Sequence, residues 1–141
     1  ICVKTLADKI RNVGDDILDV MERAGGHTLR EHVAKSDNVL IARASKSKVG
    51  AVSSFDSKRI ATKAIIENLR GNADAIAKWV KSSPPRFKKT FDLSHAHAIG
   101  KGVFQGKTKI IHGLNNSLIV LKADHQQSLG FNVLTAFPAC K

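Results

Sequence analysis

Several features that would define a specialised class of protein are scarce in this sequence. Only 2 of the 141 residues are cysteine, too few for a fold held together by a disulfide scaffold. The longest apolar run, around Ser117–Leu121, is far shorter than a membrane span. Lys4, Asp8 and Lys9 interrupt the first ten residues, so we expect no signal peptide. With 43% hydrophobic residues, the chain is expected to bury one modest core.

Ligands for a metal ion and a well-placed thiol are scarce as well. His95 and His97 would share one face of a strand, but zinc needs further Cys, His or carboxylate ligands at suitable spacing. Cys2 and Cys140 have no CxxC partner, and Cys140 follows Pro138 as the penultimate residue, a poor position for a catalytic thiol. We therefore expect no metal ion and no other cofactor. The sequence leaves open whether the two cysteines pair in an oxidising setting.

Motifs of two further enzyme classes are missing. The chain has no GxxxxGK[ST] or GxGxxG stretch for binding a nucleotide. Glycosidases need two carboxylates in a cleft, but only seven acids follow residue 24, and these lie beside cations or at helix starts. Both classes are therefore disfavoured.

Acidic residues are concentrated at the N-terminus, and the rest of the chain is basic. Residues 1–24 carry four cations and five acids, whereas residues 25–141 carry nineteen cations and seven acids, a net charge of +12. Between Arg86 and Lys122, seven cations accompany the single acid Asp92. A solvated lysine face would explain one such run, but this bias spans several elements. It favours nucleic acid as the partner over a membrane, because no basic amphipathic helix is obvious.

The first half of the chain has the periodicity of helices. Apolar residues from Leu6 to Met21 recur at three- and four-residue spacing, which predicts an amphipathic helix ended by Gly25–Gly26. Because it is acidic, we interpret 1–24 as a leader or packing helix attached to a basic domain at 25–141. Further helices are expected over 28–34, from Ser36 or Asp37 through Ala44, from Asp56 or Ser57 to Gly71, and around Ile76, Trp79 and Val80.

After Pro84–Pro85 the pattern changes to short strands. They are predicted at 88–93, 102–104, 107–112, 118–122 and 131–137, with turns at Gly106, 113–116 and Gly130. In the last strand we expect Phe131, Val133, Thr135 and Phe137 to share one face. Helices followed by a meander of strands predict an α+β fold with a twisted antiparallel sheet.

Two histidines near a predicted helix start are the best candidates for catalysis. Residues 25–33 hold His27 and His32, and Arg43 follows on the next helix. Histidine can both accept and donate a proton near neutral pH. RNA suits this chemistry because its own 2′-hydroxyl is the nucleophile, while a cation such as Arg43 stabilises the charged phosphorane. On composition alone, this pattern favours a structural role for the two histidines.

The arrangement of these residues resembles a known family. The motifs are Gly26-His27-Thr28-Leu29-x-x-His32-Val33-x-Lys35-Ser36, Leu40-x-x-Arg43, Ala51–Phe55, Ile76-x-x-Trp79, Ile99–Val103, Ser117–Leu121 and Gly130–Pro138. Together they resemble the bacterial RNase A-like toxin domains at the C-termini of CdiA-type contact-dependent growth inhibition proteins. The resemblance covers nearly all of residues 25–138. It implies an RNase A-like α+β fold without disulfides and metal-independent RNA cleavage that leaves a 2′,3′-cyclic phosphate.

The resemblance also implies roles for individual residues. His32 takes the position of the catalytic histidine, Arg43 that of the associated arginine, and Thr135 that of the threonine in the family's closing Thr-Ala-Tyr-Pro. This chain has Phe137 where that motif has tyrosine, so stacking on a base is what its ring can contribute. His27 is a candidate second acid–base group.

Other residues are candidates for substrate binding. His112, on a predicted strand that also carries two lysines, is an alternative acid, and Lys35, Lys107 and Lys109 are candidate phosphate contacts. For Lys35 the pattern favours a solvated helix lysine, and Phe137 is equally compatible with a place in the core.

The expected function is that of a toxic endoribonuclease, with two alternatives. An EndoU-type nuclease would use His27 and Lys35 as well, and a non-catalytic nucleic-acid-binding module would bind without cutting. The resemblance further implies an acidic cognate immunity protein and no membrane binding by this domain. It also implies that the domain is the C-terminus of a larger protein, which the producing cell secretes or presents on its surface. The domain would then act on RNA in the cytoplasm of the target cell.

Overall fold

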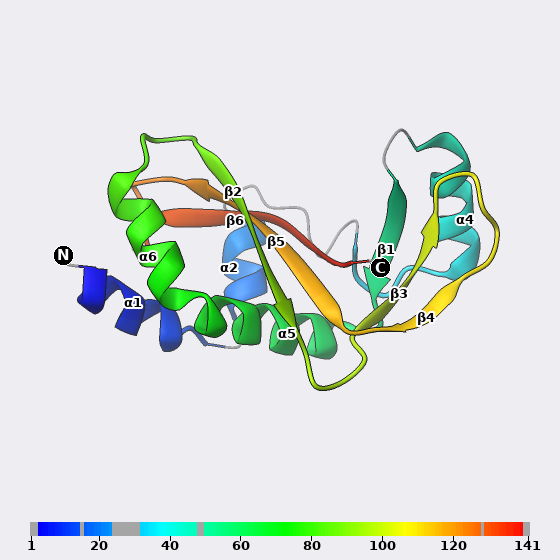
Figure 1. The fold of residues 1–141 in the computed structure, drawn as a ribbon, viewed down its shortest axis with the longest axis horizontal. Coiled ribbons are helices and arrows are strands. Elements are labelled where there is room, and N and C mark those ends of the chain that lie inside the picture. Colours follow the sequence, from blue (N-terminus) through cyan, green and yellow to red (C-terminus); the bar gives the residue numbers. More distant parts are fainter. Residues whose placement is uncertain (1–2, 15, 24–31, 48–49, 128, 140–141) are drawn as a thin grey trace.

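The computed structural model describes residues 3–14, 16–23, 32–47, 50–127 and 129–139. Its elements are α1 (Val3–Arg11), α2 (Ile17–Arg23), α4 (Asp37–Lys46), β1 (Ala51–Phe55), α5 (Lys58–Gly71), α6 (Ala73–Ser82), β2 (Lys88–Ser94), β3 (Gly100–Phe104), β4 (Ile111–Leu114), β5 (Asn116–Ala123) and β6 (Phe131–Pro138) (Figure 1). The predicted α+β class is confirmed.

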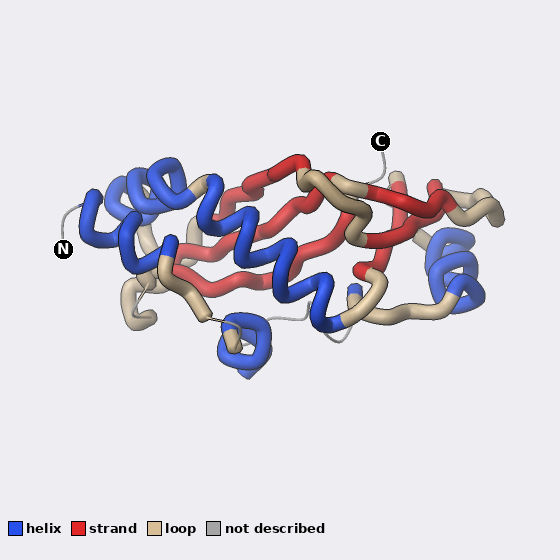
Figure 2. The backbone as a smooth tube through the Cα atoms, turned by 90° about the horizontal axis from the view of Figure 1, so that it is seen from below, coloured by secondary structure: helices blue, strands red, loops and turns tan. Residues whose placement is uncertain are grey.

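The strands form two antiparallel sheets of three strands, where a single sheet was expected. Their orders are β1-β3-β4 and β2-β5-β6. Helices α1, α5 and α6 lie along one face of the second sheet (Figure 2), while α4 packs on the first sheet through Leu40, Ala44 and Val103. The two sheets therefore belong to two lobes, and β1 and β6 approach each other where the lobes meet (Figure 1).

The acidic N-terminal segment forms two helices, where one was predicted. α1 ends at Arg11 and α2 begins at Ile17, with Asn12 and Gly14 between them. Both residue types have low helix propensity, which explains the interruption. The apolar residues of this segment are buried in the same core as those of α5 and α6; they are Leu6, Ala7, Ile10, Val13 and Ile17.

Three later helices begin and end close to where the sequence predicts. Ser36 caps α4 by accepting a hydrogen bond from the Val39 amide, and Ser57 caps α5 in the same way. α5 ends at Gly71 and α6 follows at Ala73. The helix expected over 28–34 lies mostly outside the described residues.

The strands depart from prediction at three places. The turn predicted over 113–116 is wrong, because β4 continues to Leu114 and β5 begins at Asn116. β1 lies at 51–55, where the sequence analysis assigned no element, and its partner is β3. The strand predicted over 107–112 is present only as β4, from Ile111. Residues 105–110 instead form a turn and an extended loop, with Gly106 at φ +72°, a conformation that interrupts a strand.

A β-bulge divides β6 into two parts that face different ways. Val120 pairs with Thr135 but Leu121 pairs with Val133, so Leu134 is an extra residue in β6. An extra residue reverses the alternation of side chains. Phe131 and Val133 are therefore buried under the helices, whereas Thr135 and Phe137 project from the opposite face. The expectation that all four share one face was wrong, although Thr135 and Phe137 do share theirs.

Candidate active site

Backbone contacts to β1 hold the segment that carries His32. Val33 forms a parallel bridge with Phe55, and the Ala34 amide donates to the Phe55 carbonyl at 2.9 Å. The Lys35 amide donates to Ser54 Oγ at 3.0 Å. These bonds place His32 beside β1, at the junction of the two lobes.

The ring of His32 is oriented by Ser53. Its Nδ1 lies 3.1 Å from the Ser53 carbonyl oxygen. Because a carbonyl only accepts hydrogen bonds, this contact places the proton on Nδ1 and the lone pair of the neutral ring on Nε2. The ring of Phe137 lies 5.4 Å away between centroids, tilted by 44°. His32 thus has the tautomer that a general base needs.

A largely apolar hollow of about 690 Å³ opens beside His32. We call it the apolar hollow. The first sheet contributes Val52 and Phe104 to its lining, and the second contributes Leu118 and Phe137. Its size and apolar lining, which includes the rings of Phe104 and Phe137, suit a nucleobase.

A second hollow, of about 390 Å³, shares His32 and is basic. We call it the basic hollow. Arg43 and Lys46, three residues apart on one face of α4, line it together with Ser47. A guanidinium in this place suits the two oxygens of a phosphate. Arg43 and Phe137 therefore both lie beside the ring of His32.

Ser53 also connects the two lobes. Its hydroxyl donates to the Pro138 carbonyl at 2.5 Å, and the residue is buried. The residue whose carbonyl orients His32 is thus fastened to the end of β6, one position after Phe137. This bond explains how two sheets can form one site.

Thr135 lies on the same face of β6 as Phe137 but does not line either hollow. Its hydroxyl oxygen is buried, and it has no hydrogen-bond partner among the described residues. A buried hydroxyl without a hydrogen-bond partner costs free energy, so such groups are rare in folded proteins.

The remaining candidates stand apart from the two hollows in the described part of the chain. Lys35 is half-buried in the segment that carries His32 and contacts β1. His112 is exposed on β4, and Lys107 and Lys109 are exposed in the loop before it. His27 lies outside the described residues. Sequence reasoning did not single out four residues of the site, Ser53, Lys46, Leu118 and Phe104. For Lys46 a signal exists, because its spacing from Arg43 places both on one helix face. Ser53, Leu118 and Phe104 reach the site only through tertiary contacts.

A second histidine cluster lies after β2, away from these hollows. His95 Nδ1 is 3.1 Å from Glu67 Oε1, and His95 Nε2 is 2.8 Å from Ser117 Oγ. His97 Nε2 is 3.6 Å from the same Glu67 oxygen. Burial lowers the pKa of His95 below its ordinary value of 6.5, against the opposing effect of its hydrogen bond to Glu67. His95 therefore serves the fold in its neutral form.

The stability of the protein is expected to fall as the pH drops below about 6.5. In that range His95 binds a proton in the unfolded chain but not yet in the folded chain. Protonation of His95 therefore favours unfolding. Urea unfolding at pH 7.5 and 5.5 measures this. His95→Gln should show a smaller decrease in unfolding free energy between the two pH values than the wild type. His125→Gln, which alters an exposed histidine, is the matched control. An equal decrease in all three proteins would contradict the assignment.

Two other kinds of site are absent from the described residues. Within them, no group of three or more His, Cys, Asp or Glu side chains is placed to hold a metal ion. None of the helices found there has the length and apolar character needed to cross a membrane.

Comparison with known proteins gives two matches. The family model described as the bacterial CdiA-CT RNase A domain matches residues 26–138. A solved structure of a CdiA-CT/CdiI complex from Y. kristensenii contains a chain with a similar fold, with a TM-score of 0.71 and 24% sequence identity. The match covers 77% of this chain and 95% of that one. A search of curated proteins finds no match.

Proposed function

Because the chain belongs to the bacterial CdiA-CT RNase A domain family, we propose that it is a toxic endoribonuclease that cleaves RNA without a metal ion and leaves a 2′,3′-cyclic phosphate. The single observation that carries this proposal is the placement of His32. Its Nδ1 is held by the Ser53 carbonyl, and its ring borders both an apolar hollow for a base and a basic hollow for a phosphate.

In the proposed reaction, His32 Nε2 accepts the proton of the 2′-hydroxyl. The 2′-oxygen then forms a bond to the adjacent phosphorus, and the bond from phosphorus to the 5′-oxygen breaks. Arg43 stabilises the negative charge that develops on the phosphorane oxygens. The products are a 2′,3′-cyclic phosphate on one fragment and, once an acid supplies a proton, a 5′-hydroxyl on the other.

Of the two histidines considered for that acid, His27 is favoured. His112 is on β4 and does not line a described hollow with His32. His27 precedes His32 by only five residues in the segment that carries the family motif.

Phe137 and Thr135 complete the proposed site on β6. Phe137 has no hydroxyl, so its ring contributes a face on which a base of the substrate stacks. For Thr135 we propose that its hydroxyl, which is buried and lacks a partner among the described residues, contacts bound RNA once the side chain rotates toward the site. Lys35, Lys107 and Lys109 would act only at longer range, as part of the positive field that attracts RNA.

The family also suggests the biological setting. The solved relative is a complex of CdiA-CT with CdiI. We propose that this chain is likewise neutralised by a cognate immunity protein, and that this protein is acidic because residues 25–141 carry a net charge of +12. The chain would be presented or secreted as the C-terminal part of a larger protein and act in the cytoplasm of the target cell.

Product analysis tests the proposed reaction directly. The purified chain is incubated in EDTA with a single-stranded RNA and with the same RNA carrying one 2′-deoxy nucleotide at the main cleavage position. We expect cyclic phosphate and 5′-hydroxyl ends from the first and no cut at the altered position in the second. Cleavage that leaves 3′-hydroxyl ends, or that EDTA abolishes, would contradict the mechanism. Binding without any cleavage would instead indicate a nucleic-acid-binding module.

A further inference from the structure

Two lysines face each other on the sheet face that leads away from His32. Lys88 of β2 and Lys122 of β5 are directly opposite in the antiparallel register. Lys88 is exposed and Lys122 is half-buried. Neither has an ion-pair partner within 4.0 Å in the described part of the chain. Like charges in directly opposed positions destabilise a sheet, so the lysine pair does not contribute to the stability of the fold.

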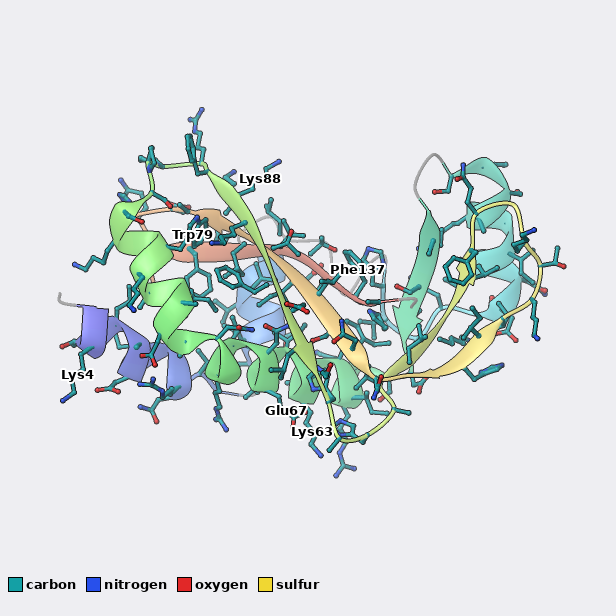
Figure 3. All side chains as sticks on the ribbon, in the orientation of Figure 1. Lys4, Lys63, Glu67, Trp79, Lys88 and Phe137 are labelled. Atoms are coloured by element: carbon teal, nitrogen blue, oxygen red, sulfur yellow. The ribbon has the colours of Figure 1, made fainter. Side chains whose placement is uncertain are left out.

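The lysine pair and the apolar hollow lie on the same face of the second sheet. Along β5, residues 118, 120 and 122 alternate onto one face, and Leu118 lines the hollow beside His32. Leu118 pairs with Phe137, and Val120 pairs with Thr135. At about 3.4 Å per residue, the four steps along β5 from Leu118 to Lys122 span about 14 Å. Figure 3 shows Lys88 at the start of β2 and Phe137 where β6 approaches β1.

The surface between the two sites has the character of a path for a single strand. Leu118 and Val120 are half-buried, so the middle of the path offers apolar surface, while its two ends offer cations. Aromatic or apolar surface beside cations is the pattern that binds single-stranded nucleic acid. Among the described helices, α1, α5 and α6 lie on the other face of this sheet (Figure 2).

Three other charged groups on or near this face also bear on its charge. Asp92 is opposite Leu118 on the edge strand and is exposed. Asp124 accepts hydrogen bonds from the Gln126 amide and from the side chain of Asn132. Asn132 is the β6 residue that pairs with Lys122 of β5. Arg86, which precedes Lys88 by two residues, is exposed and donates its amide to the Ala123 carbonyl. At the end of the face that carries Lys88 and Lys122, these lysines and Arg86 therefore outnumber one acid, Asp124, whereas Asp92 lies on the outer edge near the hollow.

We propose that Lys88 and Lys122 bind a backbone phosphate of single-stranded RNA whose scissile phosphate lies beside His32 and Arg43. The inference rests on the proposed function for the position of the cut, but the binding itself does not require cleavage. At about 3.4 Å per nucleotide of a stacked strand, 14 Å corresponds to about four nucleotides, and to fewer if the strand is extended. Substrates long enough to reach this second site bind more tightly than a dinucleotide.

The test compares Lys88→Gln/Lys122→Gln with Lys78→Gln, a control that removes a cation from the exposed side of α6. Binding is measured in a His32→Ala background, with a single-stranded RNA of about ten nucleotides, as a function of salt concentration. The double variant should weaken binding and reduce the slope of log affinity against log salt by about 0.7, the value for one phosphate contact on a single strand. With His32 intact, its KM should rise for the long RNA and stay unchanged for a dinucleotide.

Each outcome decides the inference separately from the proposed function. A double variant that binds RNA like Lys78→Gln, with the same salt slope, would overturn the second phosphate site, as would a wild-type chain that does not bind single-stranded RNA. A wild-type chain that binds but cuts no RNA would remove the proposed function and leave the binding result intact. Thermal unfolding checks the variants: losing the opposed like charges should leave stability equal or higher, so a loss of binding with an intact fold supports the site.

Discussion

Replacing His32 by alanine is expected to lower the rate of RNA cleavage by about 100- to 10,000-fold, the range typical of a general acid–base group. The reason is that His32 is the proposed general base. Its Nδ1 lies 3.1 Å from the Ser53 carbonyl oxygen, and its ring borders both hollows. Initial rates on a fluorogenic RNA substrate, measured at saturating substrate, would show this loss in kcat.

The control for this experiment is another histidine that the site does not contain. His125 is exposed in the turn between β5 and β6, and His125→Ala should cleave RNA at the wild-type rate. Equal rates for the wild type and His32→Ala would remove His32 from the mechanism. Equal losses in both variants would point to a general effect of losing an imidazole.

Replacing Gly100 by alanine is expected to lower the free energy of unfolding by about 3 kcal/mol, at the upper end of the usual cost of overpacking. Gly100 pairs with Phe55 across the first sheet. A Cβ atom at this position would overlap the Ser54 carbonyl oxygen, and it would lie 2.5 Å from Pro138 Cγ. Because a backbone carbonyl cannot rotate away as a side chain can, either the β1–β3 pairing or the approach of β6 must yield. Urea unfolding followed by circular dichroism measures the change.

A second glycine provides the matched control. An added Cβ at Gly50 meets no atom within 4 Å, so Gly50→Ala should unfold within about 0.5 kcal/mol of the wild type. If Gly100→Ala unfolds at the same urea concentration as Gly50→Ala, then the close approach at the junction of the lobes does not limit stability. A destabilised Gly100→Ala should also lose cleavage activity, because Ser53 and Pro138 hold the site together at the same junction.

Local chemistry made much of the helical part predictable. Ser36 and Ser57 cap helices where the sequence predicts, because a cap depends on one side chain and an amide three residues away. Gly14 shows the limit of periodicity: the apolar pattern continues across it, yet the helix does not. β1 was missed for a related reason, since its short run of Ala, Val and Ser has no alternation to identify a strand before its partner β3 is known.

The candidate site was predictable only in its residue types. The positions of His32 and Arg43 follow from motifs, but their joint place around the basic hollow depends on how α4 packs against β1 and β3. The bulge at Leu134 decides which β6 side chains face away from the helices, and strict alternation in the sequence predicts the wrong set. Ser53 lies within the Ala51–Phe55 motif, but the sequence does not show its two contacts, because both join residues distant along the chain.

By itself, then, the sequence determined the α+β class, the basic character of residues 25–141 and the candidate histidine, because composition, caps and motifs act over a few residues. Only the tertiary structure decided that the strands divide into two sheets, that Ser53 fastens one sheet to the other at Pro138, and that Lys88 stands opposite Lys122. These features depend on strand register and on contacts between distant residues, and a pattern read along one chain does not contain them.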